Sequence, residues 1–410
     1  MNDTLGDTLL IGLGARFFWF EDRLYVENQT ISGLKAWQKH FPRVIAFSIC
    51  DHNLPPDGWS DAETAGLLAP EFELLQLPDT YRIRTLQRSK RQAERLLLEC
   101  MNRASYRVFS YGGWVGDPGE IAAALARKNG LSHAVWLDRV ESMLIRQQGE
   151  TTIPAKVKSL IKSHVLSRFE TRAVRSADLA LLHGATVYNH FKGISRNPQI
   201  AEDIHLRAED RISATALSEK LEGVRNHPLR ILYCGRADPM KGGLEWIRTL
   251  SLIKATGVEF QAQWLGEGSQ LNEIKEQARQ LGLAEKEVSF PGFVSDRESI
   301  LQHYRDAHIL MFCHKTDESP RNLIESLHSA TPIIGYRDAY AEALVKEHGG
   351  GTLVPRGDVE ALAKSVAALA ADRTKLANLI EKAARSAMHL TREEVFKHRS
   401  DLVRRHLKRA

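Results

Sequence analysis

Residues 307–327 read AHILMFCHKTDESPRNLIESL, a stretch that decides the fold because an apolar run, a polar turn and a helical pattern follow one another. The run AHILMF is typical of a buried strand, and the apolar spacing after the turn is typical of a helix. Three carboxylates, Asp317, Glu318 and Glu325, surround the Ser-Pro-Arg-Asn turn. Packing alone seldom requires so polar a strand-to-helix corner, so we expect this one to hold a ligand.

The start of the helix in this stretch has the features of an anion site. We predict that Ser319 is the N-cap residue and that Pro320 stands in the first turn, where its missing N–H is harmless. The backbone amides of Arg321, Asn322 and Leu323 would then be available to an anion. Acceptor carboxylates on both sides of such donors suit a molecule with hydroxyl groups on both sides of a phosphate, as in a nucleotide sugar.

The same strand-corner-helix pattern recurs along the whole chain, from TLLIGLG (8–14) onward. It indicates an α/β protein with doubly wound parallel sheets, whose ligands bind at the carboxyl ends of the strands. The 410 residues, 43% hydrophobic and 26% charged, suffice for two such domains. The polar residues 218–228 predict a linker between a domain over 1–217 and a second domain over 229–388, with a terminal helix over 389–410.

A second corner, YCGRADPMKGG (233–243), places two cations after a strand. Arg236 as a fork and Lys241 as a compact charge suit a diphosphate, although the corner is not a Walker loop. WLGEGSQL adds Gly266 and Gly268, where a backbone can approach a ligand closely. The alternative for residues 233–243 is a plain basic surface loop. The alternative for the corner around residue 320 is a surface ion pair between Arg321 and Glu325, four residues apart on the helix.

Composition and charge exclude several classes of protein. A net charge of +5 is compatible with anionic ligands or lipids but is too small for a nucleic-acid-binding surface. The four cysteines form no CxxC pair, which disfavours zinc and favours a reducing compartment. The first residues lack a basic signal-peptide start, and no apolar run reaches the roughly 18 to 20 residues of a membrane span. We therefore expect a cytoplasmic protein.

Taken together and in this order, the corners resemble those of the retaining group 1 glycosyltransferases, family four, which have the GT-B fold. The segment GRADPMKG, from Gly235 to Gly242, is similar to the diphosphate-binding element of the family, and Asp317 with Glu325 is similar to its acidic pair. VSFPGFV and GTLVPRGDVEAL are also similar to family motifs. The resemblance covers about residues 229–388 and, more loosely, the whole chain.

The resemblance implies two Rossmann-like domains facing across a cleft, with the C-terminal helix crossing back to the N-terminal domain. It implies transfer of a hexose, with retention, from a nucleoside diphosphate sugar to an acceptor hydroxyl. We expect a UDP- or GDP-sugar as donor and a glycan or lipid-linked glycan of surface polysaccharide synthesis as acceptor. No metal cofactor is implied, because Arg236, Lys241 and the helix start would stabilise the departing diphosphate. The base would lie beside Phe293 and Val294.

Two departures from the family pattern leave alternatives open. Asp317 stands where the family has Glu and is followed by Glu318, so either residue is a candidate for contacting the donor sugar. In the N-terminal half, Asp138 stands near the place of a family histidine. A nucleotide-sugar epimerase and a non-catalytic nucleotide-sugar-binding protein remain alternatives. A nicotinamide site is disfavoured, because Gly12-x-Gly14 lacks the third glycine of that fingerprint.

Two basic segments, 82–95 and 154–175, interleave lysine and arginine with apolar residues. Such a face is either simply solvated or docks on an anionic membrane, where each exposed cation contributes about 1 kcal/mol. The second reading predicts a peripheral protein on the inner face of the membrane with a lipid-linked acceptor.

Overall fold

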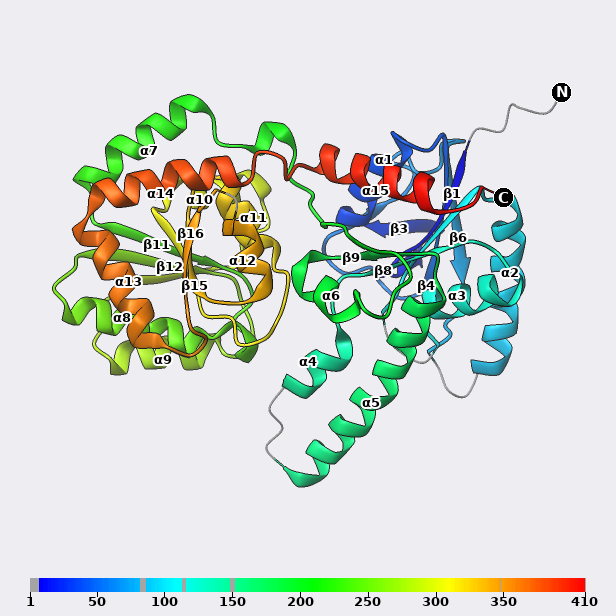
Figure 1. The fold of residues 1–410 in the computed structure, drawn as a ribbon, viewed down its shortest axis with the longest axis horizontal. Helices are drawn as coiled ribbons and strands as arrows, with labels where there is room; N and C mark the ends of the chain where they lie inside the picture. Colours follow the sequence, from blue (N-terminus) through cyan, green and yellow to red (C-terminus); the bar gives the residue numbers. More distant parts are fainter. Residues whose placement is uncertain (1–6, 82–85, 113–115, 148–151, 347, 410) are drawn as a thin grey trace. The chain divides into compact units, whose positions relative to one another are not determined.

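The computed structural model describes residues 7–81, 86–112, 116–147, 152–346 and 348–409, which fall into two compact units (Figure 1). Unit 1 consists of the chain up to His205 together with the residues from Arg392 onward. Unit 2 consists of Leu206–Thr391. Both units are α/β layers built on a mainly parallel sheet, as the alternation of strand and helix patterns predicts.

The sheet of unit 1 contains ten strands within the described residues. Its central part is parallel, and β1 lies between β4 and β7. In spatial order the parallel strands are β6 (Phe72–Leu77), β4 (Arg43–Asp51), β1 (Thr8–Gly12), β7 (Tyr106–Ser110), β8 (Ala134–Leu137), β9 (Leu179–Leu182) and β10 (Pro198–Ile200).

Three short strands outside the strand-helix alternation extend this sheet. β2 (Phe17–Phe20) pairs with β4, and β3 (Arg23–Glu27) and β5 (Trp59–Asp61) add antiparallel pairs. The β2–β3 turn is formed by Glu21 and Asp22, both with positive φ (48° and 56°). Tight hairpins usually place glycine or asparagine there, so the Glu-Asp dipeptide gives little sequence signal for a turn.

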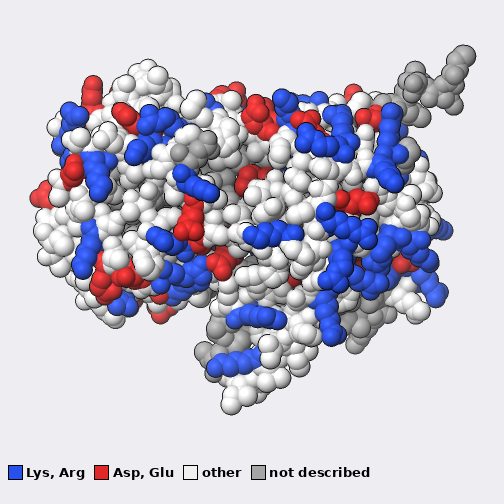
Figure 2. Space-filling view, viewed as in Figure 1, with Lys and Arg blue, Asp and Glu red and all other residues white. Residues whose placement is uncertain are grey.

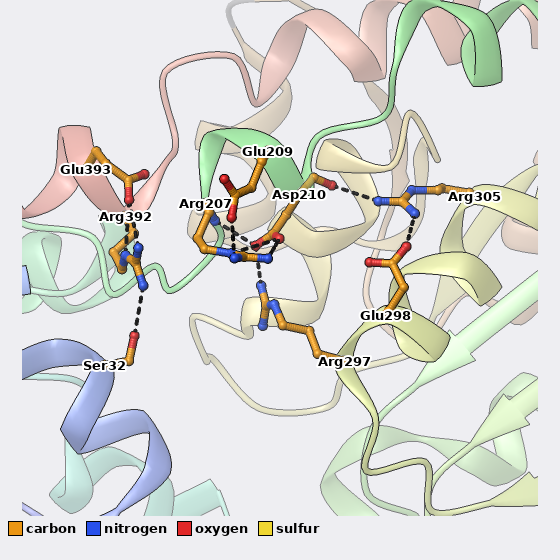
Figure 3. A network of polar contacts seen from close by, with 9 residues as sticks. All are labelled: Ser32, Arg207, Glu209, Asp210, Arg297, Glu298, Arg305, Arg392 and Glu393. Carbon is orange, nitrogen blue, oxygen red and sulfur yellow. Dashed lines mark hydrogen bonds and ion pairs between the residues drawn. The ribbon is translucent and has the colours of Figure 1, made fainter. Parts of the chain in front are cut away.

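Seven helices accompany the sheet in the described part of unit 1. They are α1 (Asn28–Gln38), α2 (Leu86–Arg103), α3 (Pro118–Lys128), α4 (Glu141–Gln147), α5 (Ile153–Ser176), α6 (Gly184–Phe191) and the C-terminal α15 (Arg392–His406). The last of them packs on the first: the rings of Phe396 and Trp37 lie 5.4 Å apart, and Arg392 donates to Ser32 at 3.1 Å (Figure 3). α4 and α5 project from the rest of the unit (Figure 1).

Within its described residues, unit 2 contains a six-stranded sheet in which every pairing is parallel. In spatial order the strands are β13 (Val288–Gly292), β12 (Phe260–Leu265), β11 (Leu229–Cys234), β14 (Ile309–Phe312), β15 (Ile333–Tyr336) and β16 (Gly351–Val354). The helices are α7 (Ala214–Asn226), α8 (Gly243–Ala255), α9 (Leu271–Gln280), α10 (Arg297–Asp306), α11 (Arg321–His328), α12 (Ala339–Lys346), α13 (Val359–Ala371) and α14 (Arg373–Ser386).

The segment 218–228, predicted as a linker, is mostly helical and belongs to unit 2. Ser213 caps α7 by accepting from the amide of Ala216, and Val224 is fully buried. Lys220 is also buried, and its ammonium donates to Thr331 at 2.5 Å. The buried side of α7 could not be recognised from its polar composition, because Lys220 makes hydrogen bonds inside the unit instead of being solvated.

The chain enters unit 2 through a network centred on Asp210, whose side chain is buried (Figure 3). Its carboxylate accepts from Arg207 at 2.8 Å and from Arg297 at 3.1 Å, and its carbonyl accepts from Arg305. Burial disfavours the charged carboxylate, but the hydrogen bonds from Arg207 and the charge of Arg297 outweigh it, so the pKa of Asp210 lies below its usual value.

Candidate active site

Both corners singled out in the sequence follow neighbouring strands of unit 2. β11 and β14 pair in parallel, with Leu232 opposite Leu310. From β11 the chain continues outward to β12 and β13 on one side, and from β14 it continues to β15 and β16 on the other. The pair therefore marks the switch point of the doubly wound sheet. Ligands of such sheets bind outside the carboxyl ends of the strands at that point. The corner 235–242 after β11 and the corner 313–320 after β14 are therefore where a ligand is expected.

Hydrogen bonds to backbone carbonyls fix these corners to each other. The amide of Lys315 donates to the carbonyl of Met240 at 2.8 Å, and the side chain of Asn322 donates to the carbonyl of Cys234 at 2.7 Å. The third corner, after β12, joins through the amide of Ala237, which donates to the carbonyl of Glu267 at 2.9 Å. The corners after β11, β12 and β14 are thus linked to one another, and this linkage fixes the positions from which their side chains project.

Glycines permit this close approach of loop to loop. A Cβ on Gly242, whose φ is 68°, would lie 2.0 Å from the carbonyl oxygen of Cys313. A Cβ on Gly266 would lie 2.2 Å from the carbonyl oxygen of Gly235, and one on Gly268 would lie 2.6 Å from that of Ala237. We expected Gly266 and Gly268 to admit a ligand, and the structure shows that they make room for the neighbouring loop.

Replacing Gly242 by alanine is expected to lower the free energy of unfolding by at least about 2 kcal/mol, because the methyl group meets backbone in addition to the cost of positive φ. Urea unfolding measures the change. Gly257→Ala is the control, since Gly257 has a φ of 80° and open space around its Cβ. Equal losses for the two variants would show that the contact with Cys313 is not limiting.

The two cations lie on the corner after β11 and differ in their surroundings. Lys241 is buried, and its Nζ lies 2.5 Å from Oε2 of Glu318 on the corner after β14. Thr316 donates to the other carboxylate oxygen of Glu318 at 2.7 Å. The side chain of Arg236 is 70% exposed and forms an ion pair with Asp238 at 2.8 Å. A fixed ammonium and an adaptable guanidinium therefore occupy the same strand end.

The structure separates the two neighbouring acids. Glu318 faces Lys241, whereas Asp317 pairs with Arg356 on the loop after β16. Glu325, one helical turn into α11, accepts a long hydrogen bond of 3.4 Å from the hydroxyl of Tyr304. Asp317 and Glu318 thus lie on the corner after β14 and Glu325 on the helix that follows it, and the three carboxylates have different partners.

A buried histidine supports the corner after β14 without adding charge to it. His314 Nε2 lies 2.9 Å from the hydroxyl of Tyr233. Burial lowers the pKa of His314 well below its usual value, and the positive charges of Lys241 and Arg356 act in the same direction. His314 is therefore neutral at physiological pH.

The predicted start of α11 is wrong by one residue. Pro320, not Ser319, is the N-cap residue, with φ −76° and ψ 126°, and the helix begins at Arg321. The fixed φ of proline suits this extended position as well as it suits the first turn. The side chain of Pro320 makes no capping hydrogen bond. The amino-terminal amides of α11 form the positive end of the helix dipole, directly after the corner whose Glu318 pairs with Lys241.

The other predicted residues have more peripheral or structural positions. Leu323 is fully buried beneath the start of α11. Phe293 follows β13 and is 72% exposed, and its neighbour Val294 is half-buried. Asp138 belongs to unit 1, where it follows β8 and accepts from the indole of Trp136 at 2.6 Å.

Unit 1 contains a polar pocket that the sequence analysis missed. It lies at the carboxyl ends of β4 and β6, has a volume of about 580 Å³, and is lined by Asp51, Asn53, Gln76 and Asp79 among others. Arg16 bridges its acids, at 3.3 Å from Asp51 and 3.8 Å from Asp79. The signal was the polar sequence DHN (51–53) at the end of an apolar strand. Searching the carboxyl ends of strands for polar residues, as was done for unit 2, would have selected it.

Among the described residues, no group of three or more histidine, cysteine, aspartate or glutamate side chains is placed to hold a metal ion. Nor does the described chain contain a helix with the length and apolar character needed to cross a membrane.

Comparison with known proteins relates unit 2 to one family and the whole chain to one fold. Residues 218–386 match the family model of the group 1 glycosyl transferases. Sucrose-phosphate synthase from Thermosynechococcus elongatus superimposes with a TM-score of 0.69 at 14% identity, over 97% of this chain and 98% of that one. No match was found among proteins of curated function.

Two further solved structures have the same two-domain fold. HepE of Anabaena, in complex with UDP, gives a TM-score of 0.66 at 15% identity, over 97% of this chain and 100% of that one. WaaG, a glycosyltransferase involved in lipopolysaccharide biosynthesis, gives 0.64 at 12% identity, over 96% and 99%. The fold predicted from the sequence, GT-B, is confirmed by these similarities.

Proposed function

The chain belongs to the group 1 glycosyl transferases through residues 218–386, and from this premise we propose that it transfers a hexose from a nucleoside diphosphate sugar to an acceptor hydroxyl. The proposal includes retention of the anomeric configuration and independence of a metal ion. The donor is a UDP- or GDP-sugar, and the complex of the structurally similar HepE with UDP favours the former.

One observation carries the proposal: the corner after β11, which carries Arg236 and Lys241, is joined to the corner after β14 that leads into α11, through the ion pair of Lys241 with Glu318 and the hydrogen bond from the amide of Lys315 to the carbonyl of Met240. A departing diphosphate gains negative charge as the bond between the anomeric carbon and its oxygen breaks. Cations and helix amides that are already in place stabilise that charge without reorganisation. The ion pair with Glu318 would hold Lys241 in position until the diphosphate shares its ammonium.

The acids around this centre suit the hydroxyl groups of the donor. We assign Glu325 to the ribose hydroxyls, and either Asp317 or Glu318 to the transferred sugar. In the transfer step the acceptor oxygen bonds to the anomeric carbon on the face that the diphosphate leaves, and the acceptor proton passes to an oxygen of the departing phosphate. Asp138 of unit 1 is the proposed contribution of that unit to the reaction.

We propose that the acceptor is a glycan or a lipid-linked glycan of surface polysaccharide synthesis, used at the cytoplasmic face of a membrane. The role of the structurally similar WaaG in lipopolysaccharide biosynthesis supports this class of acceptor. The polar pocket of unit 1, with Asp51, Asn53 and Asp79, offers hydrogen-bond partners for sugar hydroxyls.

A thermal-shift panel of nucleoside diphosphates and their sugars tests the proposal. Binding stabilises the native state by about 2.7 kcal/mol when the ligand is at 100 times its dissociation constant, so even a weak donor raises the melting temperature. Product analysis with the stabilising donor then separates the alternatives. An epimerase changes the sugar without an acceptor, a binding protein leaves the donor intact, and a glycosyltransferase releases free sugar slowly to water.

Replacing Glu325 by alanine is expected to weaken binding of the nucleoside diphosphate by about 10-fold or more, since hydrogen bonds to a charged group contribute about 1.5 to 3 kcal/mol. Calorimetry with the free nucleoside diphosphate measures the affinity. The control is Glu342→Ala, which removes a half-exposed carboxylate from α12. Unchanged affinity in the Glu325 variant would remove this residue from the site.

A further inference from the structure

The first half of α5 exposes an unusual number of large apolar side chains. The described chain has thirteen exposed large hydrophobic residues, and five of them lie between positions 153 and 165. We call them the apolar tip: Ile153 (78% exposed), Val157 (52%), Leu160 (60%), Ile161 (61%) and Val165 (40%). Isolated exposed apolar residues are ordinary, but a cluster of this kind marks an interaction surface.

The apolar tip is one face of a firmly held helix. Consecutive members are one to four residues apart, and at about 100° per residue all five fall within an arc of about 140°, on one side of α5. The opposite side is fastened to α4: Ser159 donates to the carbonyl of Ile145 at 3.1 Å, and Ser163 donates to that of Ser142 at 2.8 Å. Because these bonds define the buried side, the apolar side faces outward by construction.

Positive charge continues the same face toward the end of the helix. Arg168, Arg172 and Arg175 follow the apolar tip at helical spacing and line a groove of about 500 Å³ together with Arg127 and Arg196. We call this the arginine groove, and none of its lining residues is acidic. The space-filling view shows the projecting end mostly uncharged, with basic side chains beside it (Figure 2).

Acidic groups are missing from the exposed side of α5. The helix contains one acid, Glu170, which is buried and accepts from the hydroxyl of Ser142 at 2.5 Å. Lys156 and Lys158 are exposed among the apolar residues. A surface that is apolar at one end, basic at the other and free of exposed acid complements anionic lipid.

We propose that α5 is the membrane-docking element of the protein, with the apolar tip entering the headgroup and acyl boundary and the arginine groove binding lipid phosphates. At about 1.5 Å per residue, the apolar tip extends over about 18 Å and the arginines over about 15 Å more, lengths that suit a helix lying in the plane of the interface. Docking on a membrane would bring the protein to a lipid-linked acceptor, which agrees with the proposed function. The docking itself does not depend on catalysis.

Co-sedimentation of the full chain with vesicles tests this assignment. Vesicles of phosphatidylcholine with about one third phosphatidylglycerol are compared with pure phosphatidylcholine, at low salt and at about 1 M NaCl, where charges are screened beyond about 3 Å. We expect binding to the anionic vesicles, with part of it persisting at high salt because the apolar contribution is not screened. No binding to anionic vesicles at low salt would overturn the proposal.

Two triple variants and a matched control locate the surface. Val157→Ser/Leu160→Ser/Ile161→Ser is expected to weaken partitioning by about 50-fold or more at either salt concentration. Arg168→Gln/Arg172→Gln/Arg175→Gln is expected to weaken it by about 30-fold or more at low salt and to remove the preference for phosphatidylglycerol. The control Arg88→Gln/Arg91→Gln/Arg95→Gln removes the same charge from the exposed side of α2 and is expected to change binding by less than about threefold.

The other outcomes contradict the proposal in distinguishable ways. An equal loss in the α2 control would show that net charge, not α5, drives binding. A change of oligomeric state in the apolar variant, measured by light scattering, with unchanged vesicle binding would assign the apolar tip to a second copy of the chain. Nucleoside diphosphate binding is measured in all variants and should be unaffected. Vesicle binding without any transferase activity would contradict the proposed function alone.

Discussion

Replacing Lys241 by glutamine is expected to lower the rate of donor turnover by about 30- to 150-fold. A charge-assisted contact to the departing diphosphate is worth on the order of 2 to 3 kcal/mol at the transition state, which corresponds to that factor. Lys241 is suited to this role because it is buried and fixed within 2.5 Å of Glu318. Release of sugar from the donor to water, which needs no identified acceptor, measures the rate.

The variant Lys241→Gln/Glu318→Gln separates catalysis from stability. The single Lys241 variant leaves the shielded carboxylate of Glu318 without its cation, so part of its effect is expected on the free energy of unfolding. The double variant removes both charges and is expected to recover stability but not turnover. Recovery of turnover in the double variant would mean that Lys241 only neutralises Glu318.

Replacing Arg236 by alanine is expected to lower turnover by a similar factor, about 30- to 150-fold, without a measurable change in stability. The side chain is 70% exposed, and its ion pair with Asp238 is of the surface kind that contributes at most about 1 kcal/mol. The same donor assay, with urea unfolding beside it, measures both effects.

Arg279→Ala is the matched control for Arg236, since Arg279 is a 78% exposed arginine on α9 in the same unit. Its removal should leave donor turnover unchanged. An Arg236 variant that keeps its rate within a few fold of the wild type would show that this guanidinium does not act on the diphosphate.

The two corners of the candidate site could be predicted because their signals are local. An apolar run marks the end of each strand, and glycine or proline marks the turn that follows, so the corners at 235–242 and 313–320 follow from sequence pattern alone. That two parallel strands bring their corners together at the switch point is a property of the fold class. Neither inference requires knowledge of a side-chain contact.

What could not be predicted depends on contacts between distant residues. The pairing of Lys241 with Glu318 joins positions 77 residues apart, and it resolves the partners of two neighbouring acids that the sequence left equivalent. The helical state of 218–226 depends on Lys220 finding buried acceptors around Thr331. The proposed docking face of α5 could not be predicted for the same reason. Periodicity shows an amphipathic helix, but only packing against α4 shows which side stays exposed.

The position of a bound nucleoside diphosphate tests the central claim most directly, and a crystal structure of the chain with UDP measures it. We predict that phosphate oxygens lie within about 3 Å of Lys241 Nζ and of amides in the first turn of α11, with Arg236 turned from Asp238 toward the ligand. Diphosphate bound elsewhere, with Lys241 still paired only to Glu318 and Arg236 to Asp238, would contradict the assignment of this corner as the active site.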